Sequence, residues 1–284
     1  MQDKLKNVLL IVIVLLAITA SVFIFSSQKI GGNAESSSVP TSSSGEAASS
    51  SQKASSSVNS SSKPLSAKSE LQAQIKAIDD NLNSDYLKLI SQKSLLPDGF
   101  MPELVKISGS VYLIDKRVKP YLDNMLSDAK KAGYVPSVVS GYRTKSEQSG
   151  LYEKKITYFI TNYKYSRAKA AIEAAKIVAP PNASEHQYGM TADIISKESL
   201  NAQVVEKTPL NKWFKSHCTN YGFIVRYPNS KTDITGVIYE PWHFRYVGKE
   251  NAKAMTEQGL CLEEYRDKLV SQKAELQKQF DNLS

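Results

Sequence analysis

The first quarter of the chain limits what the remainder can fold into. The 22 residues from Asn7 to Gln28 carry no charge, and as a helix they would extend about 33 Å, enough to cross a bilayer core. The apolar run inside this stretch, Val8–Phe25, is 18 residues long, whereas a cleaved signal peptide has an apolar part of about 7–15 residues. We therefore predict an uncleaved signal anchor over residues 1–28, with cleavage after Ala34 as the alternative.

Residues 29–66 are unsuited to a folded core. Sixteen serines occur among the 32 residues from 35 to 66, and none of these residues is aromatic. Such a stretch buries too little apolar surface to offset the entropy of ordering, so we expect a flexible tether. The folded domain would then comprise residues 67–284, exposed on the outer side of the membrane.

The net charge of +8 is compatible with several partners. It could indicate nucleic acid, but for an exported domain anionic wall polymers are the better match. Only two cysteines, Cys218 and Cys261, are present, too few for a scaffold built from disulfides. Either a single Cys218–Cys261 bridge or two buried thiols would fit, and the fold must be stabilised mainly by burial of apolar side chains.

Hydrophobic periodicity predicts a mixture of helices and strands in residues 67–284. Apolar residues three and four apart predict helices, and short runs of β-branched and aromatic residues predict strands. Thr144 and Glu147 form a capping box that starts another helix. The expected helices cover residues 67–92, 115–132 and 166–179, and the expected strands cover residues 134–140, 189–195, 222–227 and 236–239.

The chain has only three histidines. We expect His217, in a helix-like stretch, to be packed or at the surface. In Tyr239–Tyr246, His243 follows Glu240 by three residues, and in a regular strand their side chains would point to opposite faces. Pro241 removes a backbone donor and restricts the residue before it, so the strand can bend and turn both side chains into one cleft. An imidazole there suits zinc and a free carboxylate can accept a proton, although the segment alone also fits an ordinary bent strand.

A second segment, residues 184–194, supplies two further candidate ligands. In a strand over residues 189–195, Asp193 points away from the core and can meet His186 across the preceding bend. Together with His243 these residues would form a His/Asp/His set that leaves a fourth position for water, as catalytic zinc sites require.

Arg143 lies where the strand ending in Ser140 passes into the capped helix. A guanidinium beside a helix N-terminus favours an anion or a developing oxyanion. Gln148 would lie about one turn into the helix and face the same cleft. On its own, Arg143 also fits a surface arginine that follows a turn.

Four segments stand in the order found in one enzyme family. They are Ser140-Gly141-Tyr142-Arg143, Ser184-x-His186-x-x-Gly189-x-Thr191-x-Asp193, Gly222-Phe223-Ile224-Val225-Arg226-Tyr227-Pro228 and Glu240-Pro241-Trp242-His243. From about residue 95 to 265 the chain resembles zinc D-alanyl-D-alanine carboxypeptidases of the membrane-anchored vancomycin-resistance type, and the related L,D-carboxypeptidases of Gram-positive cell walls. One departure is Thr191, where the family usually has alanine; its extra atoms could alter packing under the metal.

The resemblance implies an α+β fold of the hedgehog/D-Ala-D-Ala peptidase type, in which an antiparallel β-sheet carries a zinc site and helices surround it. The implied zinc ligands are His186, Asp193 and His243. The implied catalytic residues are Glu240 as general base and Arg143 against the scissile carbonyl, and the substrate-binding positions are Gln148, Ser184, Tyr142 and Trp242.

The activity implied is removal of the C-terminal D-alanine from peptidoglycan stem peptides. Two alternatives remain open: an endopeptidase that cleaves cross-links, and a non-catalytic, zinc-stabilised wall-binding domain. The presence of Glu240, His243 and Arg143 argues against the second. The sequence does not distinguish a pentapeptide from a tetrapeptide substrate.

The chain continues beyond the point near Tyr265 where family members usually stop. Four leucines follow one another at intervals of seven residues: Leu262, Leu269, Leu276 and Leu283. A helix over residues 266–284 and the helix over 67–92 could therefore pack on each other, mediate self-association, or cap the domain as amphipathic helices.

Overall fold

The computed structural model describes the backbone of residues 62–196 and 201–283. The predicted signal anchor and nearly all of the predicted tether lie outside these residues. Within the two described ranges, no helix combines the length and the apolar character needed to cross a membrane.

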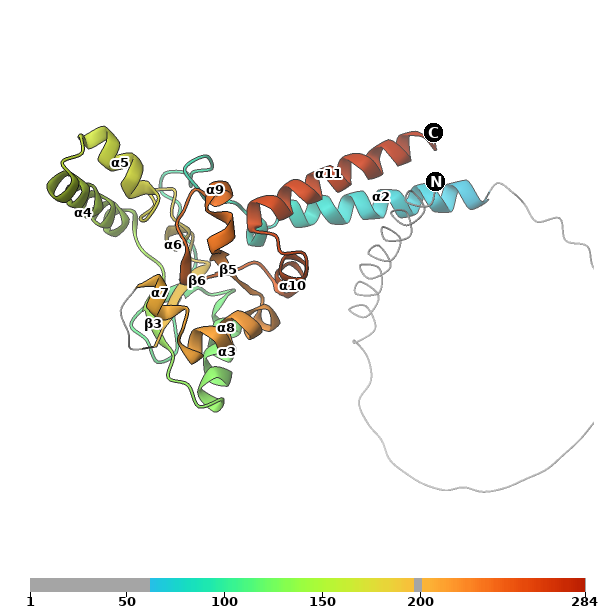
Figure 1. The fold of residues 1–284 in the computed structure, drawn as a ribbon. Coiled ribbons are helices and arrows are strands. Elements are labelled where there is room, and N and C mark those ends of the chain that lie inside the picture. The colour runs from blue at the N-terminus through green and yellow to red at the C-terminus, as the bar shows by residue number, and fades with distance from the viewer. Residues whose placement is uncertain (1–61, 197–200, 284) are drawn as a thin grey trace, which may run out of the picture. The chain divides into compact units, whose positions relative to one another are not determined.

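The centre of the fold is a four-stranded antiparallel sheet in the order β3–β4–β6–β5; Figure 1 labels three of its strands, β3, β5 and β6. Its strands are β3 (Ser137–Ser140), β4 (Thr191–Ile195), β5 (Phe223–Tyr227) and β6 (Glu240–Tyr246). The two central strands place Asp193 directly opposite His243. A separate two-stranded ribbon consists of β1 (Leu104–Lys106) and β2 (Leu113–Asp115). The expected α+β class with an antiparallel sheet is confirmed.

Helices flank the sheet (Figure 1). The α-helices in the described ranges are α2 (Ser62–Leu82), α3 (Lys119–Lys131), α4 (Lys145–Tyr163), α5 (Arg167–Ala175), α6 (Glu185–Tyr188), α7 (Ala202–Val205), α8 (Pro209–His217), α9 (Thr232–Thr235), α10 (Lys249–Glu257) and α11 (Leu262–Asp281), and the 3₁₀ turns are η1 (Asp85–Leu87), η2 (Cys218–Tyr221) and η3 (Asn229–Lys231). The predicted capping box of Thr144 and Glu147 begins α4.

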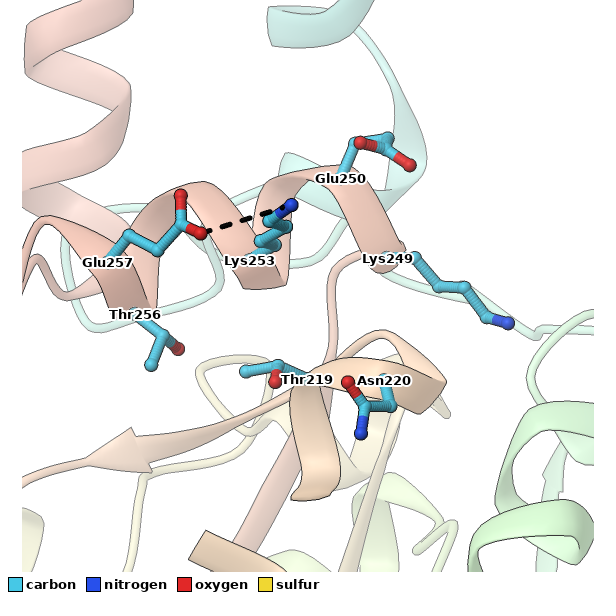
Figure 2. A pocket seen from close by; sticks show the side chains of 7 residues that line it. All are labelled: Thr219, Asn220, Lys249, Glu250, Lys253, Thr256 and Glu257. Carbon is cyan, nitrogen blue, oxygen red and sulfur yellow. Dashed lines mark ion pairs between the residues drawn. The ribbon is translucent and has the colours of Figure 1, made fainter. Parts of the chain in front are cut away.

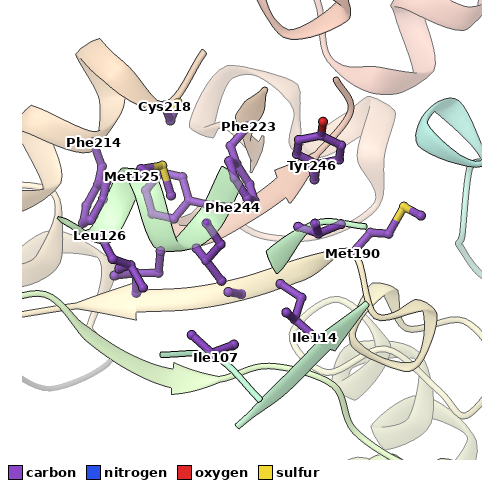
Figure 3. Packing of buried hydrophobic residues seen from close by; sticks show 14 of the residues in the cluster. Ile107, Ile114, Met125, Leu126, Met190, Phe214, Cys218, Phe223, Phe244 and Tyr246 are labelled. Atoms are coloured by element: carbon purple, nitrogen blue, oxygen red, sulfur yellow. The ribbon is translucent and has the colours of Figure 1, made fainter. Parts of the chain in front are cut away.

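The two faces of the sheet differ in chemistry. One face packs with α3 and α8 in an apolar core that includes Met125, Phe214 and Phe244 (Figure 3). Because side chains alternate along a strand, the residues beside these apolar ones point to the other face. There the sheet carries buried polar side chains, among them Asp193 and His243. The candidate site therefore lies on the face opposite the main core.

Helices α2 and α11 lie side by side (Figure 1). Leu262, Leu269 and Leu276 are buried, whereas Leu283 is 42% exposed. Of the three possibilities that the sequence left open for these helices, packing on each other is the one that the structure shows.

The predicted helix over residues 67–92 is wrong at both ends. The helix begins at Ser62, inside the predicted tether, and ends at Leu82. The guanidinium of Arg266 in α11 donates hydrogen bonds to the carbonyls of Leu82 (3.0 Å) and Leu87 (2.6 Å). In a longer helix the Leu82 carbonyl would accept a backbone hydrogen bond from the N–H four residues later. The contact with Arg266 therefore helps to end α2.

The predicted helix over residues 115–132 starts too early. Asp115 belongs to β2, and α3 begins only at Lys119. Pro120 lies in its first turn, where the missing N–H is not needed; further inside a helix the proline ring would clash.

Two predicted strands are also corrected. Residues 236–239 form no strand, because Gly236 (φ 71°) closes α9. The strand expected over 189–195 begins at Thr191, since Gly189 (φ 80°) ends α6. The elements expected over 134–140 and 166–179 are present but shorter. Both cysteines are buried and free, one of the two states expected.

Candidate active site and metal centre

A bulge in β6 brings Glu240 and His243 to the same side. Val225 pairs with Phe244, but two residues further along β5 Tyr227 pairs with Glu240, so β6 holds two extra residues at this point. A bulge of this kind bends its strand and changes where side chains point. The Glu240 Oε2 to His243 Nδ1 distance is 3.4 Å. This is the bend that the sequence predicted at Pro241.

Asn211 of α8 supports the bulge through a hydrogen bond. Its Nδ2 donates a 2.7 Å hydrogen bond to the carbonyl of Pro241, which lies within the bulged part of β6. Asn211 is 2% exposed. Sequence reasoning missed it, because nothing in its own segment indicates a distant carbonyl as its partner.

Three buried side chains converge into a possible metal site. One ligand atom each from His186, Asp193 and His243 lie within 4.8 Å of one another. Asp193 Oδ2 is 3.3 Å from His186 Nε2, and Asp193 Oδ1 is 3.2 Å from His243 Nδ1. Despite this proximity, Asp193 Oδ1 and His243 Nδ1 have no hydrogen-bond partner of acceptable geometry. Buried polar atoms are rarely left unsatisfied, so a nitrogen, nitrogen and oxygen donor set of this kind fits a zinc ion.

In each of the two candidate ligand histidines, the ring nitrogen that faces away from the donor set has its own partner. His186 Nδ1 lies 2.7 Å from the Gly141 carbonyl, and His243 Nε2 lies 3.4 Å from Glu185 Oε2. Such contacts set which ring nitrogen carries the proton and which one can bind metal. Position 141 has no space for a side chain, because a Cβ there would lie 2.4 Å from the Leu113 carbonyl.

The charged neighbours of the two buried histidines shift their pKa values in opposite directions. Burial and the charge of Arg143 lower the pKa of His186 to about 4, so this imidazole is neutral. For His243 burial also lowers the pKa, but the carboxylates of Asp193 and Glu185 outweigh it and raise the pKa to about 9. A metal ion would take the place of the proton on this imidazolium.

Glu240 has the properties of a general base. Burial raises its pKa to about 7, because the charged carboxylate is poorly solvated there. A base whose pKa lies near the operating pH transfers protons efficiently, and a cation at the neighbouring donor set would favour the ionised form.

Arg143 is held with its guanidinium toward the donor set. Its Nε donates to Ser140 Oγ (3.0 Å), its Nη1 donates to Gln148 Oε1 (2.7 Å), and its Nη2 lies 3.6 Å from Asp193 Oδ2. The side chain is 20% exposed, so part of it remains accessible to a bound molecule.

The remaining predicted residues surround this group. Gln148 is buried and also donates through Nε2 to the Ala179 carbonyl (2.7 Å), so both ends of its amide have protein partners. Ser184 accepts a hydrogen bond from the His186 backbone and caps α6. Tyr142 and Trp242 are partly exposed, next to Arg143 and His243 in the chain.

Two further expectations concern residues near the site. His217 stacks on Trp213 with 4.5 Å between ring centroids, is partly buried and is not part of the donor set, in line with the expected packed or surface histidine. Thr191 is buried, and its hydroxyl donates to the Phe244 carbonyl (2.8 Å). The extra polar atom at this position is therefore satisfied within the sheet.

A surface hollow of about 460 Å³ lies elsewhere, between η2 and α10 (Figure 2). Its lining includes Lys249, Glu250, and the Lys253–Glu257 ion pair. None of the proposed site residues lines it, and it has no donor set of its own, so it plays no part in the site described above.

The fold and the site together define a class. An antiparallel sheet that presents buried His, Asp and His donors beside a carboxylate and an arginine is the arrangement of zinc peptidases with the hedgehog/D-Ala-D-Ala peptidase fold.

Comparisons identify the family within this class. A family model described as VanY, D-alanyl-D-alanine carboxypeptidase, matches residues 112–249. A D-alanyl-D-alanine carboxypeptidase of Enterococcus faecalis is 40% identical over 181 residues, covering 63% of this chain and 65% of the relative, so the match spans slightly less than two thirds of that protein. A putative carboxypeptidase of Bacillus subtilis, YodJ, is 35% identical over 195 residues, covering 64% of this chain and 67% of the relative.

Solved structures of related proteins lead to the same family. A variant of the vancomycin-resistance D,D-pentapeptidase VanY in complex with Zn(II) has 38% identity and a TM-score of 0.57, covering 64% of this chain and 99% of that one. The LD-carboxypeptidase LdcB has 35% identity and a TM-score of 0.56, covering 66% of this chain and 87% of that one. The chain belongs to the VanY family of D-alanyl-D-alanine carboxypeptidases.

Proposed function

We propose that this chain is a zinc-dependent carboxypeptidase that removes the C-terminal D-alanine from peptidoglycan stem peptides. The observation that carries the proposal is the pair of unsatisfied buried atoms, Asp193 Oδ1 and His243 Nδ1, beside the carboxylate of Glu240. The substrate class follows from the names of the relatives, which are D-alanyl-D-alanine carboxypeptidases.

Each residue has a distinct role in this proposal. His186, Asp193 and His243 hold the zinc ion, which when bound would polarise the scissile carbonyl and acidify water. Glu240 accepts a proton from the attacking water and returns it to the amine of the departing D-alanine. Arg143 stabilises the negative charge that develops on the carbonyl oxygen.

Other residues of the site orient these groups or bind the substrate. Ser140 and Gln148 fix the guanidinium of Arg143 through hydrogen bonds of 3.0 and 2.7 Å. Gln148, Ser184, Tyr142 and Trp242 are the proposed substrate-binding residues. The same arrangement of groups could serve a D,D or an L,D peptide bond, since both hydrolyses need the same proton transfers.

We further propose that the enzyme acts at the cell wall while anchored to the membrane. The uncharged segment within residues 1–28 would be the anchor, the serine-rich segment would be the tether, and residues 67–284 would form the catalytic domain. Protease treatment of intact cells tests this arrangement: the catalytic domain should be released into the medium. Protection of the domain in intact cells would contradict it.

The activity is tested by mass spectrometry of muropeptides incubated with the full chain loaded with zinc. Pentapeptide and tetrapeptide substrates are supplied separately, and chelated and zinc-reconstituted samples serve as controls. Loss of one alanine that requires zinc supports the proposal, and the substrate that loses it assigns D,D or L,D specificity. If neither substrate changes although zinc is bound, the carboxypeptidase activity is refuted; cleavage of cross-linked muropeptides would then indicate an endopeptidase.

A further inference from the structure

A cluster of buried charges lies directly behind the candidate metal site. Glu185 Oε1 is 2.7 Å from Arg226 Nε and 2.8 Å from Arg245 Nη1. The side chains of these three residues are at most 1% exposed. Charges so deeply buried are costly to desolvate unless they are well paired, and an apolar cluster would stabilise the fold at least as well. The arrangement therefore calls for a functional reason.

The second oxygen of the same carboxylate supplies that reason. Both guanidinium groups approach Oε1 of Glu185, and Oε2 faces Nε2 of His243 at 3.4 Å. His243 has its other nitrogen, Nδ1, turned toward Asp193. A carboxylate that is held by two arginines and accepts the Nε2–H bond leaves the Nδ1 lone pair available at the donor set.

We propose that Glu185 is a positioning residue that fixes the ring orientation and tautomer of His243, and that Arg226 and Arg245 hold Glu185 in place for this purpose. The inference rests on the proposed metal site. Glu185 contributes no atom to the donor set of His186, Asp193 and His243 and acts through His243.

The cluster extends to the C-terminal helix. Glu263, in the first turn of α11, makes two hydrogen bonds with Arg226, at 2.9 Å to Nη1 and 2.6 Å to Nη2. This residue lies beyond the segment matched by the family model, which ends at residue 249. Through Arg226 and Glu185, the start of α11 is thus connected to the ring of His243, and we expect α11 to contribute to metal affinity.

The test is the zinc dissociation constant of the full chain, measured by competition with a chromophoric chelator. In Glu185→Gln, the amide offers one acceptor and one donor end, whereas three donors, from two arginines and one histidine, approach the present carboxylate. We expect zinc affinity to fall about 10- to 100-fold, the range typical when a group that orients a metal ligand is replaced. The melting temperature of the metal-free protein reports whether the variant is folded.

Glu263→Gln is the milder variant, since Glu263 lies at the edge of the cluster with its side chain 14% exposed. The matched control is Glu264→Gln, the same change at the next residue, which pairs with Lys231 at 2.8 Å instead of Arg226. Glu264 also accepts from the Cys261 backbone N–H at 2.9 Å at the start of α11, a hydrogen bond that the oxygen of a glutamine can accept as well. We expect the first to weaken zinc binding severalfold and the second to leave it unchanged. Equal zinc affinities in these two variants would overturn the connection to α11.

The tautomer itself can be observed by ¹⁵N NMR of the zinc-loaded wild-type chain, because only three histidines contribute signals. His243 should carry its proton on Nε2, and His186 should carry its proton on Nδ1. A proton on Nδ1 of His243, or a folded Glu185→Gln variant that binds zinc as tightly as wild type, would overturn the proposal. If the wild-type chain binds no zinc at all, it is the proposed function that fails.

Discussion

At the scale of single residues, the candidate site brings carboxylates close together, and a bound cation would offset their negative charge. Two carboxylates, Asp193 and Glu240, lie within 3.4 Å of the same His243 nitrogen, and their side chains are 9% and 12% exposed. Like charges at such a distance repel each other, and a divalent ion between the donors would reduce that repulsion.

Zinc should therefore stabilise the folded chain. At a free zinc concentration 100 times the dissociation constant, the expected gain is about 2.7 kcal/mol, or about 5–10 °C in melting temperature for a domain of this size. Differential scanning calorimetry with and without zinc measures it. His243→Ala should lose the response, whereas His217→Ala, which changes a histidine outside the donor set, should retain it.

Arg143 should contribute to the rate far more than to the fold. Replacement by lysine keeps the charge but loses the fork that Ser140 and Gln148 orient. We expect kcat to fall about 10²- to 10³-fold, as when one oxyanion donor is removed. Lys145→Met is the control, because Lys145 is exposed and pairs only with Asp98 among the described contacts. An unchanged kcat in Arg143→Lys would exclude this role.

The sequence was sufficient for residues whose partners are close in the chain or part of a motif. The spacing in residues 184–194 and 239–246 predicted His186, Asp193 and His243 as one set, and the structure brings them together. Glu185 and Asn211 were missed, because their partners are 58 and 30 residues away and their roles exist only once the sheet has formed.

At the scale of elements, the site depends on two departures from regular structure. The bulge in β6 turns Glu240 toward His243, and the close approach of β3 to Leu113 places the Gly141 carbonyl against His186. A regular strand could not supply either feature. Its side chains alternate between the two faces of the sheet, so Glu240 and His243 would point to opposite faces.

Gly141→Ala should disturb the second of these features. The added Cβ would lie 2.4 Å from a backbone carbonyl, so the strand end must move, at a cost of about 1–3 kcal/mol and with weaker zinc binding. Gly150→Ala is the control: nothing lies within 4 Å of its added Cβ, and in helix α4 alanine should stabilise by up to about 1 kcal/mol. Chemical denaturation measures both, and equal effects would contradict the argument.

Predicted elements were wrong where a distant contact decides the boundary. The apolar periodicity of residues 67–92 does continue past Leu82, but Arg266 engages the Leu82 and Leu87 carbonyls from another helix. The early start given to α3, by contrast, was avoidable, since Pro120 fixes the first helical turn from its own sequence.

At the scale of the whole molecule, the terminal helices α2 and α11 pack on each other and meet the edge strand β5 at one end of the pair (Figure 1). Leu262 and Leu269 belong to an apolar cluster with Ile224 of β5 and Val247. The buried leucines of the repeat therefore pack against other parts of the same chain, and α11 lies against α2. The spacing of the repeat left this partner as one of three possibilities, and self-association through the same helices stays a prediction.

Deletion of residues 266–284 should destabilise the fold. It removes the buried side chains of Leu269 and Leu276, each worth about 2–5 kcal/mol when a core leucine is lost, together with the Arg266 contacts. Deletion of residues 282–284 alone is the control and should have little effect. Denaturant unfolding measures the difference. Sedimentation of the same proteins tests self-association: fewer chains per particle after deletion of residues 266–284 would support it, and an unchanged number of chains would refute it.

The central claim is that zinc binding and proton transfer belong to different residues of one site. Its most direct test is Glu240→Gln, with zinc content and turnover of the muropeptide substrate measured on the same preparation. The account predicts one zinc ion per chain, as in wild type, and turnover reduced about 10²- to 10⁴-fold. Near wild-type turnover in this variant would contradict the account, and loss of zinc would show that Glu240 is needed to hold the metal.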